Sequence, residues 1–280
     1  MVNQIIKSVK GTFFHDPKSL YNEEKAYLNK PFFFNGTNSQ AVLLIHGWSS
    51  TPYEVRRLGK FLNEAGYTTY GPQLRGHGTV PKDLENVKWT DWFVDVKRAY
   101  AELKKNHSKV FVMGTSIGAN LAILLAAERP EIPGLVLLAT PYKIKFEKLV
   151  ILFAKSLKMV KPYSKKYYPP TFGLSTSITR LISYQTYPVK SALETFDLIK
   201  IARTKLRNVK QPCFLIQSGS DHIVTRKSLE DIYNRIGSKI KQKKIIKRAY
   251  HTFISDVKNS HVFEDILAFI KANENRNLHQ

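Results

Sequence analysis

Apolar and polar positions along the chain follow two alternating patterns. Short runs such as 41–46, which ends in His46, and 110–113 are otherwise continuously apolar, which is typical of strands buried on both faces of a sheet. Between the runs lie longer segments, such as 91–104, whose apolar residues recur at helical spacing. This alternation predicts an α/β fold with a mostly parallel central sheet and helices on both faces. The strands are expected at 41–46, 67–70, 110–113, 135–139, 214–217 and 244–249.

Helix boundaries can be read from the residues that flank each periodic segment. Thr51 and Glu54 have the spacing of a capping box around Pro52, and Gly66 is expected to stop the helix that follows. The segment 119–128 is apolar nearly all round, which predicts a buried helix. The helices of this pattern are expected at about 51–64, 91–104, 119–128 and 257–271.

The segment 141–207 departs from this pattern. It begins with an apolar helix flanked by lysines at 144–160, continues through an aromatic, proline-containing loop at 161–173, and closes with a helix near 191–207. A segment of this length is too long for a connection between two strands, so we predict an inserted helical cap, or lid. The predicted division is a core of 1–140 and 208–280, with the cap at 141–207.

The segment 114–118 reads GTSIG and lies between a predicted strand and the buried helix. A turn this tight admits only small residues at Gly114 and Gly118, and it holds Ser116 in a strained conformation with its hydroxyl exposed. The helix that follows would direct its free N–H groups and the positive end of its dipole toward the serine. The alternative is a plain strand–helix turn that happens to contain glycines. Because a buried strand is predicted before this turn and a buried helix after it, we interpret Ser116 as a nucleophile.

A serine hydroxyl is a poor nucleophile unless a base takes its proton and an acid orients that base. Asp221 follows the strand at 214–217, and His251 follows the strand at 244–249. Both therefore lie at carboxyl ends of strands, where α/β sheets place their active sites. Each residue alone has an ordinary alternative, an Asx turn for Asp221 and a surface loop for His251. Their order after Ser116 favours acid and base.

Other acids and histidines fit these roles less well. Asp197 and Asp256 do not follow a predicted strand. His222 is a weaker candidate for the base, and His261 falls within the last predicted helix.

Acyl transfer also needs donors for the oxyanion of the tetrahedral intermediate. The backbone N–H of Ile117, directly after the serine, is one candidate, and the N–H of Trp48, after the first buried strand, is the other. We expect His46 to be structural, and the glycine-rich loop 75–78 to be a turn bonded to its neighbours.

The chain is strongly basic, with 44 Lys and Arg against 22 Asp and Glu and a net charge of +22. The excess concentrates in the second half, above all in 141–207. We interpret most of it as solvated surface charge, and we hypothesise peripheral contact of the lysine-flanked cap with anionic membrane surfaces. The basic residues form no aromatic-interleaved motif or basic helix, so we expect no nucleic-acid partner.

Several classes of protein are disfavoured. The N-terminal residues lack the apolar core of a signal peptide, and no apolar run approaches the length of a membrane span, so we predict a cytoplasmic protein. The single cysteine, Cys213, excludes an internal disulfide and is expected in the core. No HExxH, CxxC, Walker or GxGxxG pattern is present, and we expect neither a metal nor another cofactor.

Taken together, these motifs resemble the α/β-hydrolase superfamily, and more narrowly the bacterial carboxylesterases and monoacylglycerol lipases. The motifs that carry the resemblance are HGW at 46–48, RGHG at 75–78, GTSIG at 114–118, SGSDHIV at 218–224 and YHTF at 250–253. Ala119 and Tyr250 stand where members of the family often have glycine.

The resemblance implies an α/β-hydrolase fold with a lid between the strands ending near Ala139 and beginning near Cys213. It implies Ser116, Asp221 and His251 as the triad and the N–H groups of Trp48 and Ile117 as the oxyanion hole. The expected activity is hydrolysis of a small-molecule ester, with the apolar cap holding an acyl chain. Hydrolysis of a C–C or amide bond by the same residues, or a non-catalytic lipid-binding role, are the alternatives.

Overall fold

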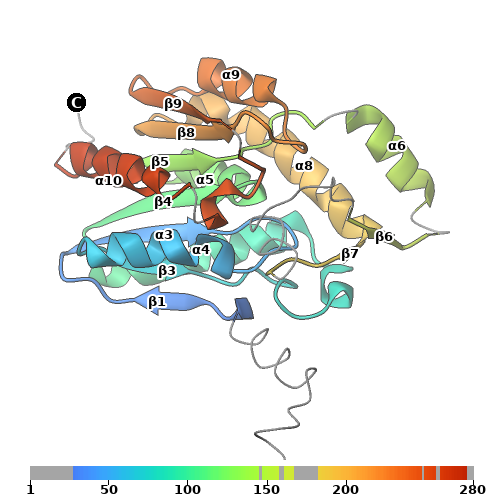
Figure 1. Ribbon diagram of the computed structural model, residues 1–280, viewed down its shortest axis with the longest axis horizontal. Helices are drawn as coiled ribbons and strands as arrows, with labels where there is room; N and C mark the ends of the chain where they lie inside the picture. Colours follow the sequence, from blue (N-terminus) through green and yellow to red (C-terminus); the bar gives the residue numbers. More distant parts are fainter. Residues whose placement is uncertain are drawn as a thin grey trace, which may run out of the picture.

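A seven-stranded sheet forms the centre of the molecule (Figure 1). The computed structural model describes residues 28–144, 147–157, 161–166, 182–247, 249–256 and 259–275. The strand order is β1-β3-β2-β4-β5-β8-β9, and every neighbouring pair is parallel except β1 with β3. The strands are β1 (Phe32–Phe34), β2 (Gln40–Ile45), β3 (Thr68–Gly71), β4 (Lys109–Thr115), β5 (Leu135–Leu138), β8 (Cys213–Ser218) and β9 (Lys241–Ile246).

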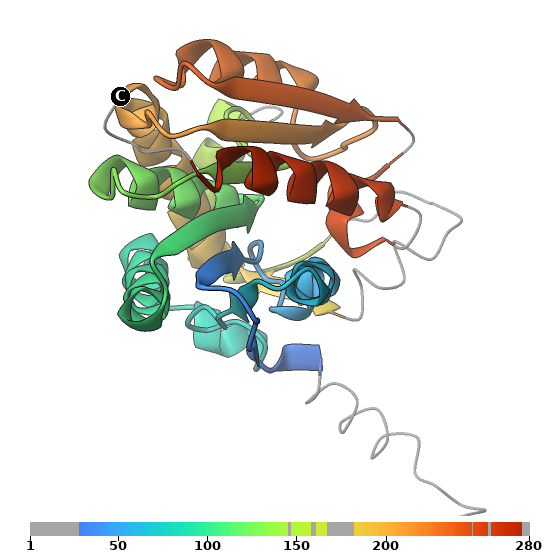
Figure 2. The same cartoon turned by 90° about the vertical axis from the view of Figure 1, so that its left-hand side faces the viewer.

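Helices cover both faces of this sheet (Figures 1 and 2). One buried cluster joins the sheet to α4, α5, α8 and α9, and a second joins the opposite face to α3 and α10. The predicted fold class, a mostly parallel sheet between two layers of helices, is confirmed. The helices are α3 (Tyr53–Glu64), α4 (Trp89–Asn106), α5 (Ile117–Glu128), α8 (Val189–Lys205), α9 (Arg226–Arg235) and α10 (His261–Asn273).

The apolar runs of the sequence become the central strands because both of their faces are covered. In β2, Leu43 and Ile45 belong to the cluster with α4 and α5, whereas Val42 and Leu44 belong to the cluster with α3 and α10. Successive side chains of a strand point to opposite faces, so a strand in the middle of such a sheet has no polar side to show. The continuous apolar pattern is therefore a direct consequence of two-sided burial.

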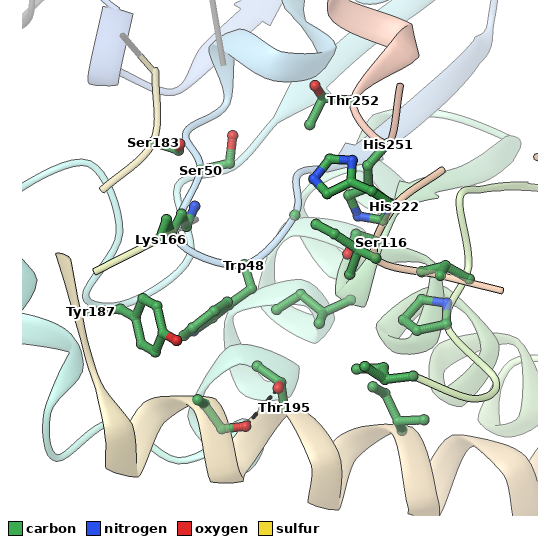
Figure 3. Close-up of a pocket in the computed structure, with 18 of the residues that line it drawn as sticks. Trp48, Ser50, Ser116, Lys166, Ser183, Tyr187, Thr195, His222, His251 and Thr252 are labelled. Atoms are coloured by element: carbon green, nitrogen blue, oxygen red, sulfur yellow. Dashed lines mark hydrogen bonds between the residues drawn. The ribbon is translucent and has the colours of Figure 1, made fainter. Parts of the chain in front are cut away.

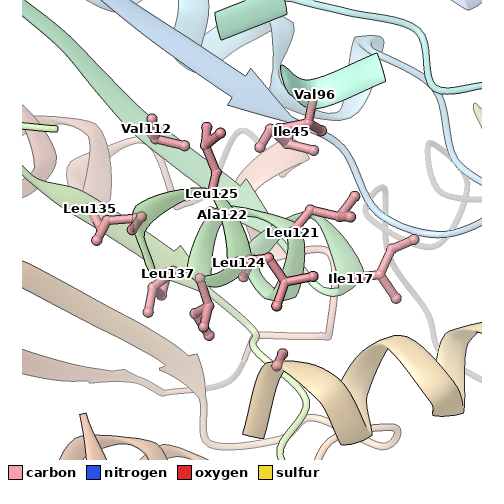
Figure 4. Packing of buried hydrophobic residues seen from close by; sticks show 14 of the residues in the cluster. Ile45, Val96, Val112, Ile117, Leu121, Ala122, Leu124, Leu125, Leu135 and Leu137 are labelled. Atoms are coloured by element: carbon pink, nitrogen blue, oxygen red, sulfur yellow. The ribbon is translucent and has the colours of Figure 1, made fainter. Parts of the chain in front are cut away.

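Helix α5 is buried along most of its length. Its residues from Ile117 to Ala126 are all buried, between the sheet on one side and α4 and α8 on the other (Figure 4). Leu121 and Leu125 are fully excluded from solvent and pack in the same cluster as Ile45 and Val112. A helix that is apolar all round is stable only in such surroundings, so its sequence predicted its location.

The segment between β5 and β8 contains further elements, which are α6 (Glu147–Leu157), β6 (Tyr163–Lys165), β7 (Thr186–Pro188) and α8. Strands β6 and β7 pair antiparallel, and α8 contributes Leu198 and Ala202 to the core cluster of α5. The helices predicted at 144–160 and 191–207 correspond to α6 and α8, and α6 lies to one side of the sheet layers (Figure 1). The assignment of 141–207 as a separate cap stays a prediction.

At the edges of the fold, two elements were missed and two predicted boundaries were wrong. Strand β1 and helix α9 were not predicted, since β1 has only three residues and α9 buries few apolar side chains. The edge strand β9 begins at Lys241, three residues before the predicted start, because its lysines are solvated and hide the strand pattern. Helix α10 begins at His261 rather than at 257.

The capping box predicted at the start of α3 was also wrong. The Thr51 hydroxyl donates to the carbonyl of Leu28 at 2.9 Å, and no side chain caps the helix. The Glu54 carboxylate instead accepts the backbone N–H of Gly47. The helix nevertheless ends as predicted, with Gly66 after it at φ 100°.

Within the described residues, no helix is long and apolar enough to cross a membrane.

The tight packing between α5 and the end of β2 predicts the effect of replacing Gly118. A Cβ atom at this position would lie 2.3 Å from the carbonyl oxygen of Ile45, so Gly118→Ala forces two backbones apart. We expect the free energy of unfolding, measured by urea denaturation, to fall by about 1–3 kcal/mol.

The matched control is Gly219→Ala, where the added Cβ meets the end of the flexible Arg226 side chain at 3.1 Å. We expect a change within about 0.5 kcal/mol for this variant. Equal losses in the two variants would contradict the packing argument.

Candidate active site

The candidate site lies at the carboxyl edge of the sheet, between β2 and β4. From β2 the chain passes to β3 on one side, and it then crosses to β4 on the other side. The loops leaving β2 and β4 therefore diverge and leave a crevice between them. The loop beginning at His46 and the turn at Ser116 border this crevice.

Ser116 adopts a strained backbone conformation between β4 and α5. Its φ and ψ are 54° and −122°, which a residue with a side chain rarely adopts and which costs about 1–3 kcal/mol. The turn tolerates no side chain at its two glycines, because a Cβ on Gly114 would lie 2.2 Å from the carbonyl carbon of Gly118. The sequence prediction for this turn matches the geometry observed.

The turn places Ser116 at the positive end of a helix. Helix α5 begins at Ile117, and the first N–H groups of a helix have no acceptor within the helix itself. Ile117 and Ser116 both line the pocket described below. Negative charge that develops beside the serine therefore meets backbone donors and the positive helix end.

His251 and Asp221 form a buried hydrogen-bonded pair. The distance from His251 Nδ1 to Asp221 Oδ2 is 2.7 Å, and the side chains are 9% and 1% exposed. A carboxylate can only accept, so Nδ1 carries the proton and Nε2 is left with a free lone pair. The pair thus presents a proton acceptor rather than a donor at the outer ring nitrogen.

Asp221 is held in place by other groups. Its Oδ1 accepts the N–H groups of Ile223 and Val224, at 2.8 and 2.9 Å, and its Oδ2 accepts the Gln217 side-chain amide at 2.8 Å. Burial alone would raise the pKa of Asp221, but His251 and these backbone donors outweigh it and lower the pKa. The carboxylate stays ionised and orients the imidazole.

Ser116 and His251 line one pocket of about 290 Å³ (Figure 3). Trp48 and Ile117, predicted as oxyanion donors, line it too. The structure thus brings four of the five predicted site residues to one cavity, with Asp221 behind His251.

Trp48 is anchored by the segment between β5 and β8. Its indole N–H donates to the Ser191 hydroxyl of α8 at 2.9 Å. Its ring packs edge to face on Tyr187 of β7, with a centroid distance of 4.8 Å. The loop that holds the Trp48 backbone is therefore positioned partly by β7 and α8.

Glu54 is a pocket residue that the sequence analysis misassigned. Its Oε2 accepts the Gly47 N–H at 2.8 Å, and the residue is only 1% exposed. A Cβ on Gly47 would lie 3.2 Å from Glu54 Oε2 and 3.3 Å from Ser116 Cβ, so Glu54 lies directly beneath the loop beside the serine. Burial raises its pKa. No sequence pattern separates this role from that of a helix cap.

His46 is structural, as the sequence analysis expected. Its Nδ1 donates to the Gly47 carbonyl at 2.9 Å, and its Nε2 accepts the Leu74 N–H at 3.2 Å. Burial lowers the pKa of His46 to about 4, so the ring is neutral. His77, from the glycine-rich loop 75–78, is buried and packs edge to face on His46 and Trp92.

Of the alternative candidates for the acid and the base, His222 lines the pocket and the others do not. His222 lines the pocket beside His251 (Figure 3), whereas His261 is the first residue of α10. Asp197 belongs to α8, and Asp256 follows a short turn after His251. Within the described ranges, no cluster of His, Cys, Asp and Glu could hold a metal ion.

The fold and the serine turn define the protein as an α/β-hydrolase. The family model for Hydrolase_4, described as serine aminopeptidase S33, matches residues 36–258. The chain belongs to this family, and the predicted resemblance is confirmed.

Relatives of known name cover nearly the whole chain. A carboxylesterase of Bacillus subtilis (strain 168) is 29% identical over 252 residues, which are 88% of this chain and 98% of the relative. A thermostable monoacylglycerol lipase of Bacillus sp. (strain H-257) is 28% identical, over 85% of this chain and 92% of the relative. A solved structure of a metagenome-derived lipolytic enzyme, described with the pair LipS and LipT, aligns with a TM-score of 0.79. That alignment has 26% identity over 87% of this chain and 97% of the other.

The pairing of His251 with Asp221 predicts how the imidazole titrates. Burial lowers the pKa of His251, but the Asp221 carboxylate outweighs burial and raises the pKa above its ordinary value of 6.5. We expect the NMR titration of this imidazole to have its midpoint above pH 6.5. In Asp221→Asn the charge is gone and burial remains, so the midpoint should fall below 6.5.

His251→Gln identifies the signal, since its resonance must disappear. A midpoint that Asp221→Asn leaves unchanged would show that the carboxylate does not control this histidine.

Proposed function

We propose that the protein hydrolyses carboxylic esters through an acyl-enzyme formed on Ser116. The observation that carries this proposal is the meeting, in one pocket, of a strained serine at a helix N-terminus and a histidine held by a buried carboxylate. The two named relatives support the choice of esters as substrates, because one is a carboxylesterase and the other a monoacylglycerol lipase.

In the first half of the reaction, Ser116 Oγ attacks the ester carbonyl while His251 Nε2 takes the hydroxyl proton. Asp221 stabilises the imidazolium that forms and keeps the ring oriented. The proton then passes to the alkoxide oxygen as the C–O bond breaks, and the alcohol leaves. In the second half, the same imidazole takes a proton from water as the water oxygen attacks the acyl-enzyme. The bond between the acyl carbon and Ser116 Oγ then breaks, the imidazolium returns the proton to Oγ, and the acid departs.

The oxyanion of each tetrahedral intermediate would be bound by the backbone N–H groups of Ile117 and Trp48. Ile117 provides the first donor of α5, and Trp48 belongs to the loop that Glu54 supports from below. Removing a single oxyanion donor costs roughly 100- to 1,000-fold in kcat in well-studied serine hydrolases. The position of this loop therefore contributes substantially to the rate, although less than the serine itself.

The lining of the pocket favours an acyl chain over a polar acid. Apolar side chains come from α8 and from the loops after β5 and β8, and they are Ile144, Phe196, Ile199, Ile223 and Val224. We propose short- to medium-chain acyl esters or monoacylglycerols as substrates. Tyr167, Tyr168 and Phe172, in the aromatic loop of the predicted cap, lie outside the described residues.

Peptide hydrolysis is the second candidate, since the description of the matching family names a serine aminopeptidase. An aminopeptidase must bind a free ammonium group, whereas this pocket already contains the side chain of Lys166. An aminoacyl p-nitroanilide in the substrate panel tests this candidate directly.

Replacing Ser116 tests the proposed reaction. We expect the wild type to release p-nitrophenol from butyrate and octanoate esters, and Ser116→Ala to lower kcat by about 10⁴-fold or more. Mass spectrometry of the wild type mixed with a slow ester should show the acyl group on Ser116.

Ser108→Ala, at an exposed serine far along the sheet, is the matched control and should keep full activity. Full activity in Ser116→Ala would refute the mechanism. If the protein hydrolyses the aminoacyl p-nitroanilide in preference to the esters, its function is peptide cleavage and not ester cleavage.

We also propose that α6 contacts anionic membrane surfaces. Leu149 and Leu152 of this helix are 52% and 63% exposed, in a region of the chain rich in lysine. The protein should co-sediment with vesicles containing phosphatidylglycerol more than with phosphatidylcholine vesicles. The double substitution of Leu149 and Leu152 by serine should abolish this binding, while equal binding to both vesicles would refute the proposal.

A further inference from the structure

One wall of the pocket carries a cationic side chain that the proposed reaction does not use. Lys166 follows directly after β6 and lines the same cavity as Ser116. Figure 3 shows it on the same side of the pocket as Ser183, above Trp48 and Tyr187. This wall is polar, whereas α8 and the loops after β5 and β8 provide the apolar lining.

The Lys166 ammonium group has no ion-pair partner among the residues that the structure describes. It lies over the Trp48 ring, 5.9 Å from the centroid, and it is attracted to Glu54 at longer range. Glu54 is itself buried and accepts the Gly47 N–H. Within the described part of the chain, this pocket lysine therefore has no hydrogen-bonded anionic partner.

An ammonium group in such surroundings favours an anion as its partner. Burial lowers the pKa of Lys166 to about 8, with Glu54 opposing this effect, so the group is still mostly charged at pH 7. Desolvated charges gain most from a charge-assisted hydrogen bond, which forms when a ligand supplies the missing negative group.

The location of Lys166 assigns this anion to one part of the substrate. The positive charge of Lys166 acts on His251, where it lowers the pKa of the imidazole. His251 delivers its proton to the departing alcohol in the proposed reaction. The apolar walls are left for the acyl chain, so the polar wall at Lys166 faces the alcohol part of the ester.

We propose that Lys166 binds an anionic group, a phosphate or a carboxylate, on the alcohol part of the ester substrate. Lys166 thereby makes the enzyme selective for esters of an apolar acid with a negatively charged alcohol. This inference rests on the proposed ester hydrolysis and names the substrate class of the same site.

Three esters of one acid test the selectivity, namely octanoylglycerol, octanoylglycerol phosphate and octanoylglycerate. Release of octanoate gives kcat and KM for each. We expect a higher kcat/KM for one or both charged esters in the wild type. Lys166→Met should lower kcat/KM for those esters by roughly 10- to 100-fold relative to kcat/KM for octanoylglycerol, mainly through KM.

The chain offers a matched control one residue away. Lys165, the last residue of β6, is exposed and is not among the residues that line the pocket, so Lys165→Met removes the same charge without changing the pocket lining. This variant should keep the wild-type selectivity. Lys166→Arg should retain part of the selectivity for the charged esters that Lys166→Met loses. Selectivity for the phosphate ester alone identifies a phosphate, and selectivity for the glycerate ester alone identifies a carboxylate.

Binding gives a readout that does not depend on turnover. In the Ser116→Ala background, calorimetry should show octanoylglycerol phosphate or octanoylglycerate binding roughly 10- to 100-fold more weakly once Lys166 is also replaced by Met. Equal binding with and without Lys166 overturns the inference.

The two proposals fail in different ways. Hydrolysis of octanoylglycerol with no preference for either charged ester refutes the role of Lys166 and leaves ester hydrolysis standing. Absence of hydrolysis of all three esters and of the p-nitrophenyl esters refutes the proposed function, and the binding experiment still decides whether Lys166 holds an anion.

Discussion

The close approach of α5 to the end of β2 is the constraint on which the rest of the structure depends. Gly118 contacts the carbonyl of Ile45 so closely that no side chain fits between them. Because the two backbones meet, the helix must begin directly after Ser116, which takes a φ of 54°. Burial of a leucine contributes about 1.5–3 kcal/mol, so Leu121 and Leu125 together offset a strain of about 1–3 kcal/mol. The apolar core of α5 thus keeps a strained serine at the edge of the sheet.

The loop after β2 is supported from two sides, which ties the core to the segment between β5 and β8. From below, the Glu54 carboxylate accepts the Gly47 N–H. From above, Ser191 holds the Trp48 indole, and the carbonyl of Ser49 accepts the Tyr184 N–H at 2.8 Å. A loop held in this way has little freedom, which is what a preorganised oxyanion site requires. The segment between β5 and β8 therefore positions part of the proposed oxyanion site and also lines the pocket.

The charges around the pocket depend on one another because they are shielded from water. Asp221 raises the pKa of His251, Glu54 acts in the same direction, and Lys166 opposes both. Burial raises the pKa of Glu54 and lowers that of Lys166. The charge of each group opposes this effect on the other, so each favours the charged form of the other. The positive and negative groups come from different parts of the fold, since Lys166 follows β6, Glu54 belongs to α3, and Asp221 follows β8. The pocket thereby becomes polar on one wall and stays apolar on the other.

The sequence by itself determined the central sheet, α5 and the turn at Ser116. A strand buried on both faces requires a run of apolar residues, and a close contact between two backbones requires glycine. Both features can therefore be recognised in the sequence. Strand β1, too short to show a pattern, and the edge strand β9, with its solvated lysines, became defined only by pairing with their neighbours. The roles of Glu54 and Lys166 were likewise decided by the tertiary structure. Nothing in the local sequence distinguishes a buried carboxylate from a helix cap, or a pocket lysine from a surface lysine, because burial depends on residues distant along the chain.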